Sequence, residues 1–484
     1  MRRTITTLMF LAVGGLAFAL QAAEPGQASG NWNYYAAGLS RYRISDDDES
    51  AAASGTEQSN VSTAVGQPDT ASEDKKAVYL TEKTASAGEL LQTNYFAGGG
   101  DGCCQSACGC DNNCSGNSCL SNCCDCNCTI NSFRFELLGW FSRGRSTPPL
   151  VTTNPDGTPS GSAGALDVGS TSILYGNDPI GGGIRTGGRV TFSHLFSDNV
   201  TSGTVRFWGV EDKSEDFVTN STQRSIIAQP FFNVLLGQQD AFLVAYPGIT
   251  DPGSIRVLSK NDLIGADAWL SRNWYDDGCS SIDVLGGYQF TRLDDSLTIN
   301  SSTVLVDPVA VGSGLDPNTA IGIFDSFRTQ NEFHGGSMGV IARSYRGNVT
   351  LEGLFKVALG SMRQAVIVNG NTTITPPGGV AANTAGGLLA QPTNIGSQQT
   401  HRFSFSPELN LNVLYNLDSN WRLIGGYSFI YWNSVVLAGN QIDTRVNPSQ
   451  FTGGGIVGAL APQPKFQRTD FWVQGINLGA EYNW

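Results

Sequence analysis

The sequence predicts an all-β protein: a closed antiparallel transmembrane β-barrel of about 12 strands (10–14 as the range), preceded by a disordered, Cys-rich N-terminal extension. Three observations predict this fold. The chain opens with a secretion signal, and no later stretch is apolar over the ~18 residues that a membrane helix needs. From Thr129 onward, segments of roughly ten residues alternate apolar and polar side chains. Without such helices a membrane protein must be a closed barrel, because lipid offers its backbone no hydrogen-bond partners.

The N-terminal residues have the composition of a signal peptide followed by a disordered tail. Arg2 and Arg3 precede an apolar stretch at 5–20, and Ala22 and Ala23 offer cleavage sites, so we expect residues 1–23 to be removed. A membrane anchor is the alternative, but the apolar run is short for a bilayer span. Residues 24–102 are rich in Ser, Ala, Gln, Asp and Glu, which predicts a disordered acidic tail. We expect this tail in the periplasm, where its partner is unknown.

Ten of the eleven cysteines lie within residues 103–128. Closely spaced cysteines in an oxidising compartment favour disulfides, whereas clustered thiolates could instead bind Zn²⁺ or Cu(I). Two separated C-x₂-C pairs are missing, so a standard zinc site is not supported and disulfides are favoured. Cys279 could pair with this cluster or stay a thiol. The disulfide candidates are Cys103, Cys104, Cys108, Cys110, Cys114, Cys119, Cys123, Cys124, Cys126 and Cys128.

Twelve segments in 129–484 are the expected strands of an outer-membrane β-barrel domain. Four short links at 197–202, 275–280, 345–348 and 416–420 interleave with long ones at 142–184, 294–330, 364–400 and 434–469, as in barrels with short periplasmic turns and long outer loops. If both ends of the barrel domain lie in the periplasm, the number of strands must be even, and segment 241–246 supplies the twelfth strand. The expected strands are 133–141, 185–196, 203–211, 224–236, 241–246, 262–274, 281–292, 331–344, 349–363, 402–415, 421–433 and 470–484.

The last strand shows the alternation most clearly. Ile476, Leu478 and Tyr482 share one face, while Asn477 and Glu481 share the other. Aromatic residues near the strand ends, namely Trp140, Trp421, Trp432, Trp472 and Trp484, predict the interfacial girdles of a membrane barrel. The terminal pattern Asn477, Gly479, Tyr482 and Trp484 predicts a signal for the barrel-assembly machinery. We expect an outer-membrane protein that contacts lipid. The sequence leaves open whether the protein forms a homo-oligomer.

Charged residues on the polar faces are the candidate functional residues. We expect them to line a pore for small solutes or ions, where mixed charges tune selectivity. In the alternative, the charged residues pair with one another and fill the barrel. The protein would then be structural, or would bind partners through its long outer loops or its Cys-rich tail. Barrels of this size occur both open and filled. The candidate pore-lining residues are Arg134, Glu136, Asp283, Glu352, Lys356, Arg402, Glu408, Arg422 and Glu481.

Enzyme and nucleic-acid functions find little support. The net charge of −13 opposes phosphate binding. The three histidines, His194, His334 and His401, stand singly, so no metal-ligand pair and no nucleophile–base motif appears. We expect no catalytic residue, metal or cofactor. Asp325-Ser326 with His334 is the alternative, as a Ser/His/Asp set, but no motif positions it.

The barrel half also resembles a known family, the beta-barrel porin-7 family of outer-membrane porins. The resemblance spans nearly all of 130–484 and implies an outer-membrane barrel, with no catalytic residues. It does not cover the Cys-rich tail. Its motifs are FRFE at 133–136, TPPLVTT at 147–153, RTGGR at 185–189, QPFFN at 229–233, GGYQFTRLDDSL at 286–297, DSFRTQNEF at 325–333 and GINLG at 475–479.

Overall fold

The computed structural model describes residues 131–452 and 455–484. The expected signal peptide at 1–23, the acidic tail at 24–102 and the Cys-rich segment at 103–128 lie outside these residues. In the described part, strands dominate and the helices are two short 3-10 turns, η1 (Ala438–Gln441) and η2 (Pro448–Thr452). None of these described helices has the length and apolar character of a membrane span. The expected all-β class is therefore confirmed.

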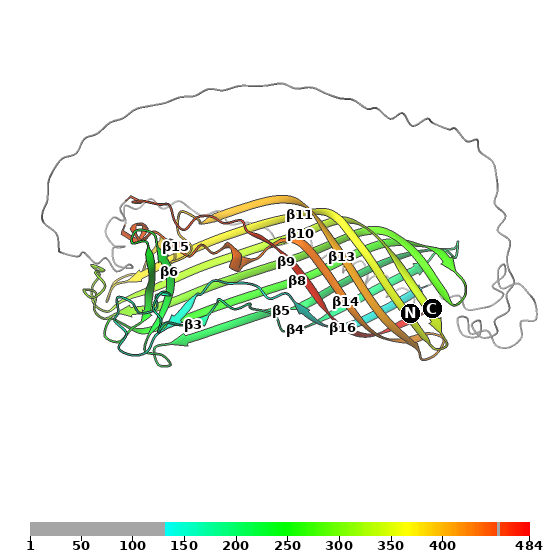
Figure 1. Cartoon of the computed structure of the whole chain (residues 1–484), viewed down its shortest axis with the longest axis horizontal. Helices are drawn as coiled ribbons and strands as arrows, with labels where there is room; N and C mark the ends of the chain where they lie inside the picture. The colour runs from blue at the N-terminus through cyan, green and yellow to red at the C-terminus, as the bar shows by residue number, and fades with distance from the viewer. Residues whose placement is uncertain (1–130, 453–454) are drawn as a thin grey trace, which may run out of the picture.

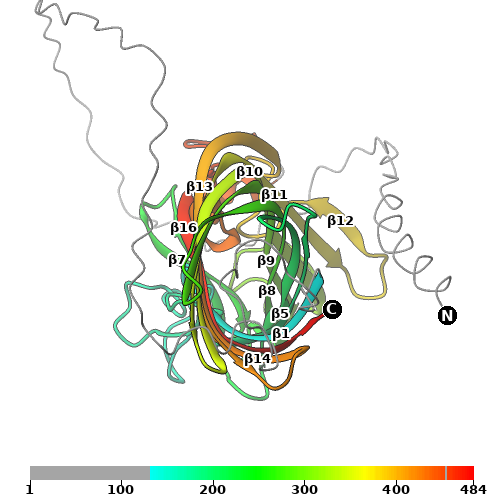
Figure 2. The same cartoon turned by 90° about the vertical axis from the view of Figure 1, so that its right-hand side faces the viewer.

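Ten long strands of the described chain form one antiparallel ring (Figures 1 and 2). Around the ring they run β10, β9, β8, β5, β4, β1, β16, β14, β13 and β11, and the β10–β11 pairing joins the two ends of this order. The strands are β1 (Asn131–Ser142), β4 (Ile184–Leu195), β5 (Thr201–Asn220), β8 (Thr250–Asp276), β9 (Ser280–Leu305), β10 (Thr319–Arg346), β11 (Val349–Thr375), β13 (Gly396–Asn416), β14 (Trp421–Val436) and β16 (Arg468–Asn483).

Two of the twelve expected strands lie outside this ring. They are β6 (Ile227–Asn233) and β7 (Gln238–Ala245), which pair with each other in a second sheet. Most of their side chains are buried on both faces, whereas a strand in a membrane wall must turn one face to lipid. The ring thus has ten strands rather than twelve, at the lower end of the expected range of 10–14. This second sheet also contains β2 (Val151–Thr153), β3 (Ser172–Tyr175) and β15 (Arg445–Val446).

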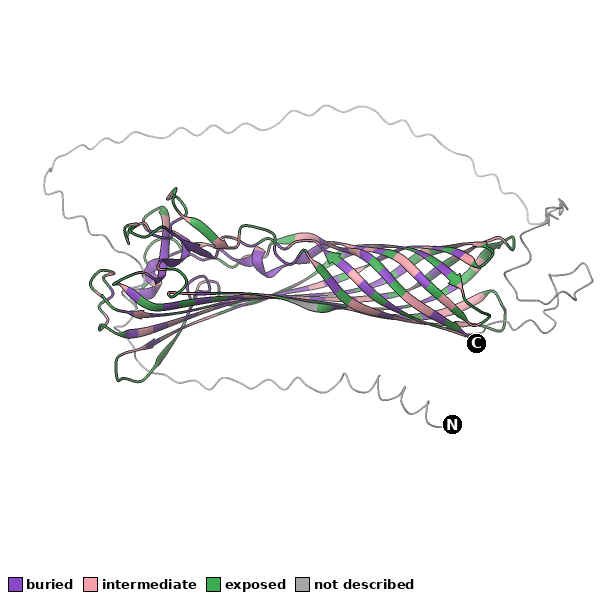
Figure 3. Ribbon diagram, turned by 90° about the horizontal axis from the view of Figure 1, so that it is seen from below, coloured by how far each residue is buried: buried purple, intermediate pink, exposed green. Residues whose placement is uncertain are grey.

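Side chains of the ring strands alternate between a buried inner face and an exposed outer face (Figure 3). In β9, Val284 and Tyr288 point outward, while Leu285 and Gln289 point inward and are buried. The apolar outer positions form a belt that covers 282–290 in β9 and 351–359 in β11. Nine residues match the ~9–11 that a tilted strand needs to cross the hydrocarbon core.

A row of polar side chains marks one border of this apolar belt. Arg292, Glu332, Arg363 and His401 are direct neighbours on β9, β10, β11 and β13. Arg363 Nη1 lies 2.6 Å from Glu332 Oε2. Charged pairs on the outer face are more stable in water than in an apolar environment. This row therefore marks where the apolar part of the outer surface ends.

The strands reach far beyond that border, which the sequence did not reveal. β8, β9, β10 and β11 have 27, 26, 28 and 27 residues. Much of the expected loops 294–330 and 364–400 is therefore strand, and those two expectations are wrong. Past Arg292 the outer face of β9 carries polar side chains such as Asp294 and Ser296, so the apolar outer face ends although the pairing continues.

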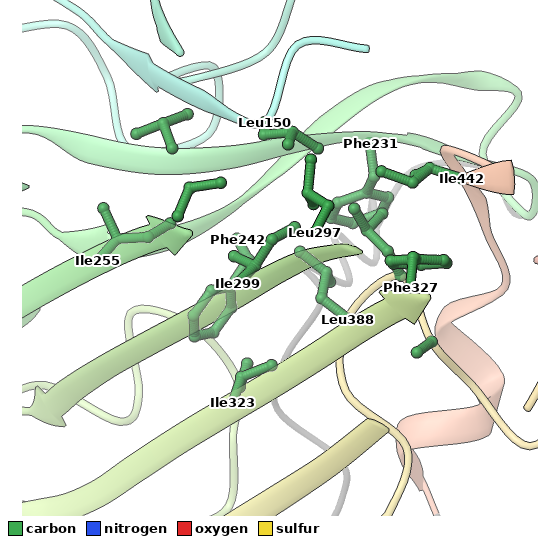
Figure 4. Close-up of a cluster of buried hydrophobic side chains, with 14 of the residues drawn as sticks. Leu150, Phe231, Phe242, Ile255, Leu297, Ile299, Ile323, Phe327, Leu388 and Ile442 are labelled. Atoms are coloured by element: carbon green, nitrogen blue, oxygen red, sulfur yellow. The ribbon is translucent and has the colours of Figure 1, made fainter. Parts of the chain in front are cut away.

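The ring opens at this far end. The neighbouring strands β4, β1, β16 and β14 stop there, while β5, β8, β9, β10, β11 and β13 continue as a curved sheet. The second sheet lies against it, and Leu150, Phe231 and Phe242 pack on Ile299 and Phe327 between the two layers (Figure 4). A short strand, β12 (Ala382–Ala385), extends the edge beside β11. The molecule thus combines a ring at one end with a double sheet at the other.

Pro407 explains why β13 and β14 separate early. The β13–β14 ladder ends at Glu408–Ile430, while the β13–β11 ladder continues to Gly396–Val368. Proline has no backbone N–H and so interrupts a ladder. Asn433 of β14 partly replaces the missing ladder, because its Oδ1 accepts a hydrogen bond of 3.0 Å from the Phe405 N–H.

The four short turns that join neighbouring ring strands lie at the end that holds Asn131 and Trp484. The turns after Leu195, Asp276, Arg346 and Asn416 are short, as expected, and the Asn131 N–H donates to the Trp484 carbonyl at 2.9 Å. Trp421, Tyr482 and Trp484 form a girdle there, with ring centroids 4.9 and 5.6 Å apart. Trp140 and Trp432 are no part of a girdle, because they point inward and are each 1% exposed.

Candidate functional site

Four charged side chains form a closed loop of ion pairs inside the ring. Arg206 of β5 contacts Asp267 of β8 at 2.8 Å and Glu408 of β13 at 2.7 Å. Lys356 of β11 contacts Glu408 at 3.0 Å and also pairs with Asp267. Both cations lie over the Trp269 ring, 5.3 and 5.5 Å from its centroid. We call these four residues the central ion loop.

The contact between Arg206 and Glu408 spans the ring. β5 and β13 are five places apart in a ring of ten strands, so they stand on opposite walls. A 2.7 Å ion pair between opposite walls places charged side chains where the axis of a channel would run.

A second cluster extends this network along the axis. Arg189 of β4 binds both carboxylate oxygens of Glu136 at 2.6 Å each, and its Nη1 reaches Asn410 of β13 at 3.1 Å. Asn477 donates to Glu136 at 2.7 Å. A bidentate pair of this kind fixes both side chains in one geometry.

The third cluster occupies the mouth at the short-turn end. Arg134 bridges Glu352 at 2.9 Å and Glu481 at 2.7 Å. Arg343 bridges Glu352 at 2.9 Å and Asp283 at 2.5 Å. These arginines are partly exposed, with 15% and 29% of their side chains accessible to solvent. This mouth cluster therefore closes the network toward the short turns.

Burial separates this interior from a water-filled channel. A lining side chain of an open pore must be reachable by water, yet Lys356 is 0%, Glu136 1% and Glu408 1% exposed. Among the residues that these ion pairs join, the charges also balance. Six cations (Arg134, Arg189, Arg206, Arg343, Lys356, Arg422) face six anions (Glu136, Asp267, Asp283, Glu352, Glu408, Glu481).

An aromatic layer lies beyond the charges, toward the double sheet. Trp140, Trp208, Phe333, Trp432 and Phe471 come from five different ring strands, and each is 5% exposed or less. The Trp140 and Trp208 rings lie 5.3 Å apart. Because these rings project inward at one level, apolar side chains cross the interior where a channel would continue.

The connection after β14 adds a third layer, which we call the strap (residues 437–452 and 455–467). It enters the ring through η1, and the Ala438 N–H donates to Asp295 Oδ2 at 2.8 Å. Asn331 of β10 exchanges two hydrogen bonds with the backbone of Val436, at 2.7 and 2.8 Å. Arg145 pairs with Asp295 at the same level. The strap is thus anchored by buried side chains of the opposite wall.

The candidate residues from the sequence divide into two groups. Arg134, Glu136, Asp283, Glu352, Lys356, Glu408, Arg422 and Glu481 all point inward and take part in the ion pairs. Arg402 lies apart, exposed on the part of β13 beyond Pro407 where β14 no longer pairs. The sequence thus located most of the network, although it gave no pairing partners.

Four members of the network were missed: Arg189, Arg206, Asp267 and Arg343. A signal for them existed. Arg206 stands between the outward Val205 and Phe207, and Asp267 stands between Ala266 and Ala268. A single charged residue in the middle of a membrane strand must point inward.

The expected assembly signal divides between the two faces of β16. Asn477 joins the interior network and Tyr482 and Trp484 belong to the outer girdle. Gly479 faces inward at a close approach of strands, where a Cβ atom would collide with the carbonyl oxygen of Phe135. Its role in assembly stays a prediction.

Asp325 is a buried carboxylate of the double sheet, seven residues beyond the border row at Glu332. It accepts hydrogen bonds from the backbone N–H groups of Ala390 and Leu389 at 2.7 and 3.0 Å. Burial raises the pKa of Asp325 to about 6, against the opposing effect of these bonds. Asp325 points inward and His334 points outward on the same strand, where it contacts Tyr288, so they form no catalytic set.

An antiparallel strand ring with an apolar outer face and a charged interior is the architecture of barrel proteins. The chain belongs to the family described as "Putative beta barrel porin-7", whose model matches residues 133–484. This confirms the family resemblance of the sequence motifs. No curated protein sequence matches the chain significantly.

Several solved structures are similar to the chain. The outer membrane protease OmpT from Escherichia coli has 8% identity and a TM-score of 0.33, covering 73% of this chain and 97% of that one. A TodX deltaS2S3 mutant, a monoaromatic hydrocarbon channel, has 9% identity and a TM-score of 0.21, with coverage of 73% and 90%. The P. putida toluene transporter TodX has 8% identity and a TM-score of 0.15, with coverage of 73% and 89%. Similarities this low say nothing about activity.

Proposed function

We propose that the chain is an outer-membrane β-barrel with a sealed lumen, which carries its double sheet outside the cell as a binding surface and is not an enzyme. The short turns and the N-terminal tail lie in the periplasm. The apolar belt supports the membrane placement, because its nine-residue height fits a tilted strand. The observation that carries the sealed state is the 2.7 Å contact of Arg206 with Glu408 across the ring.

A passive pore is the second candidate, favoured by the family description. Water and ions could pass only if the central ion loop and the aromatic layer both moved aside. Separating buried charges without replacing their partners costs roughly 3–5 kcal/mol for a single pair. The resting state of this barrel is therefore closed.

Planar-bilayer recording of the purified full chain tests the closed state. We expect insertion without stable conductance. Insertion is checked on the same sample by heat-modifiable migration in gels, since a folded barrel migrates differently before boiling. A stable conductance would establish the pore instead, if the reversal potential of Lys356→Glu also shifts in the direction of greater cation selectivity. An absence of heat-modifiable migration would contradict the membrane barrel itself.

A further inference from the structure

The outer wall of the ring has an apolar groove on β4, β5, β8 and β9. Its volume is about 540 Å³, within the ~300–1,000 Å³ typical of ligand sites. The strand register defines its shape. Phe192, Val205, Ala268 and Tyr288 form one row across the four strands, and His194, Gly203, Leu270 and Gly286 form the next row toward the short turns.

Residue size along these rows makes the hollow. Ala268 and Gly286 form a low floor, while Phe192 stands on one side and Tyr288 on the other. Gly203 is covered, because a Cβ atom there would lie 3.3 Å from Phe196 and 3.6 Å from Leu270. A Cβ atom on Gly286 would meet nothing within 4 Å, so open space lies above this strand. Leu270 and Tyr288 are 58% and 47% exposed on this surface. The groove lies within the apolar belt, which on β9 runs from 282 to 290.

A cation lies beside the groove at its short-turn end. Arg272 occupies the next outward position of β8 after Leu270, is exposed, and pairs in register with Thr201. In the described chain, no salt bridge joins Arg272 to a carboxylate. Asp198 of the adjoining turn accepts from the Thr201 hydroxyl at 2.6 Å, and this hydrogen bond, with a smaller contribution from the charge of Arg272, lowers the pKa of Asp198. An apolar hollow that ends at an arginine matches a molecule with an apolar chain and an anionic head.

We propose that this groove binds one phospholipid of the periplasmic leaflet, with an acyl chain over Ala268 and Gly286 and the phosphate at Arg272. The inference rests on the proposed membrane placement, because only then does the short-turn end meet that leaflet. The snorkelling of an arginine to the head-group level fits this geometry.

Lipid retention by matched glycine variants tests the site. Wild type, Gly286→Phe and Gly336→Phe are reconstituted into vesicles of phosphatidylethanolamine and phosphatidylglycerol, extracted in mild detergent and weighed intact by native mass spectrometry. Gly336 is the control, since it is also exposed, faces outward and has open space above it, but does not line the groove. We expect one retained phospholipid in wild type and Gly336→Phe, and at least tenfold less in Gly286→Phe.

Two further variants separate the parts of the site. Leu270→Ala removes a wall without adding bulk and should also lower retention, which keeps the test valid if Gly286→Phe folds poorly. Arg272→Gln should lower phospholipid retention several-fold while a detergent alkyl chain still binds. Equal retention in Gly286→Phe and wild type, detergent adducts alone, or the mass of a second protein copy would each overturn the proposal. Heat-modifiable migration of the same samples reports separately on the barrel.

Discussion

Arg206 shows how a single residue determines the state of the interior. Its guanidinium satisfies two buried carboxylates, Asp267 and Glu408, on different walls of the ring. Without it, Lys356 alone would face both carboxylates. The central ion loop is balanced only as a set of four, which is why its members cannot be exchanged independently.

Replacing Arg206 by Met should therefore destabilise the barrel strongly. We expect a loss of roughly 3–5 kcal/mol in the free energy of unfolding, because a buried carboxylate loses its partner. Urea unfolding in lipid vesicles measures this. The control is Arg256→Met, which breaks an exposed pair with Asp216 in which both side chains are over 40% exposed, and which should cost at most ~1 kcal/mol. Equal losses in the two variants would show that the interior charges are solvated.

Asp325 makes a pH-dependent contribution in the double sheet. Burial raises its pKa to about 6 from the ordinary 3.8, so the folded state holds the proton more tightly than the unfolded state. Its stabilising contribution is full below pH 3.8 and is lost as pH rises through 6, by roughly 3 kcal/mol in all. Hydrogen exchange of the loop at 386–391 should show more protection at pH 5 than at pH 8.

Asp325→Asn provides the control for this effect. The amide keeps an acceptor for Ala390 but does not titrate over this range, so loop protection should no longer change between pH 5 and pH 8. Protection in the wild type that instead grows with pH would mean that the backbone N–H groups stabilise the carboxylate more than burial penalises it.

At the residue scale, the sequence predicted which face of a strand a charged side chain lies on, but not which side chain it pairs with. Alternation placed Glu352, Lys356 and Glu408 on inner faces because the period of a strand is two. It could not pair Glu408 with Arg206, since these residues are 202 positions apart and meet only because the strands close into a ring. It misplaced Arg402 because Pro407 releases that part of β13 from β14.

At the element scale, alternation marks where a strand faces lipid, not where it ends. β9 and β10 pair up to Leu305 and Thr319, well past the border row, where water replaces lipid outside. There an apolar outer face is no longer needed, so the pattern fades while the strand continues. The β6–β7 hairpin is the converse case, because its apolar residues cover a sheet from outside the ring.

The last strand should matter for assembly through its terminal residues. β16 joins β1 to β14, so it joins strands from the two ends of the described chain. Trp484→Ala should reduce the heat-modifiable fraction several-fold, because Trp484 stacks on Tyr482 at the girdle. Trp472→Ala, at the other end of the same strand, should have little effect. Normal amounts of folded barrel from Trp484→Ala would show the terminal signal to be accidental.

At the scale of the whole molecule, the layers have separate surroundings. The apolar belt meets lipid, the central ion loop and aromatic layer fill the ring, and the double sheet has its own hydrophobic core (Figure 4). The strap connects the last two, because its backbone binds Asp295 inside the ring while Ile442 packs in the double-sheet core. The strap thus contacts both the ring interior and the double-sheet core.

The same arrangement of layers predicts the orientation of the barrel in the outer membrane, which can be measured in intact cells. Val380, beyond β11 at the double-sheet end, is 91% exposed, and Leu417, in the short turn after β13, is 56% exposed. Val380→Cys should react with a membrane-impermeant maleimide on intact cells, whereas Leu417→Cys should react only after the outer membrane is permeabilised. The native Cys279 lies in another short turn and gives no outside background in this orientation. Labelling of Leu417→Cys in intact cells, with Val380→Cys protected, would reverse the barrel and with it the leaflet assigned to the phospholipid groove.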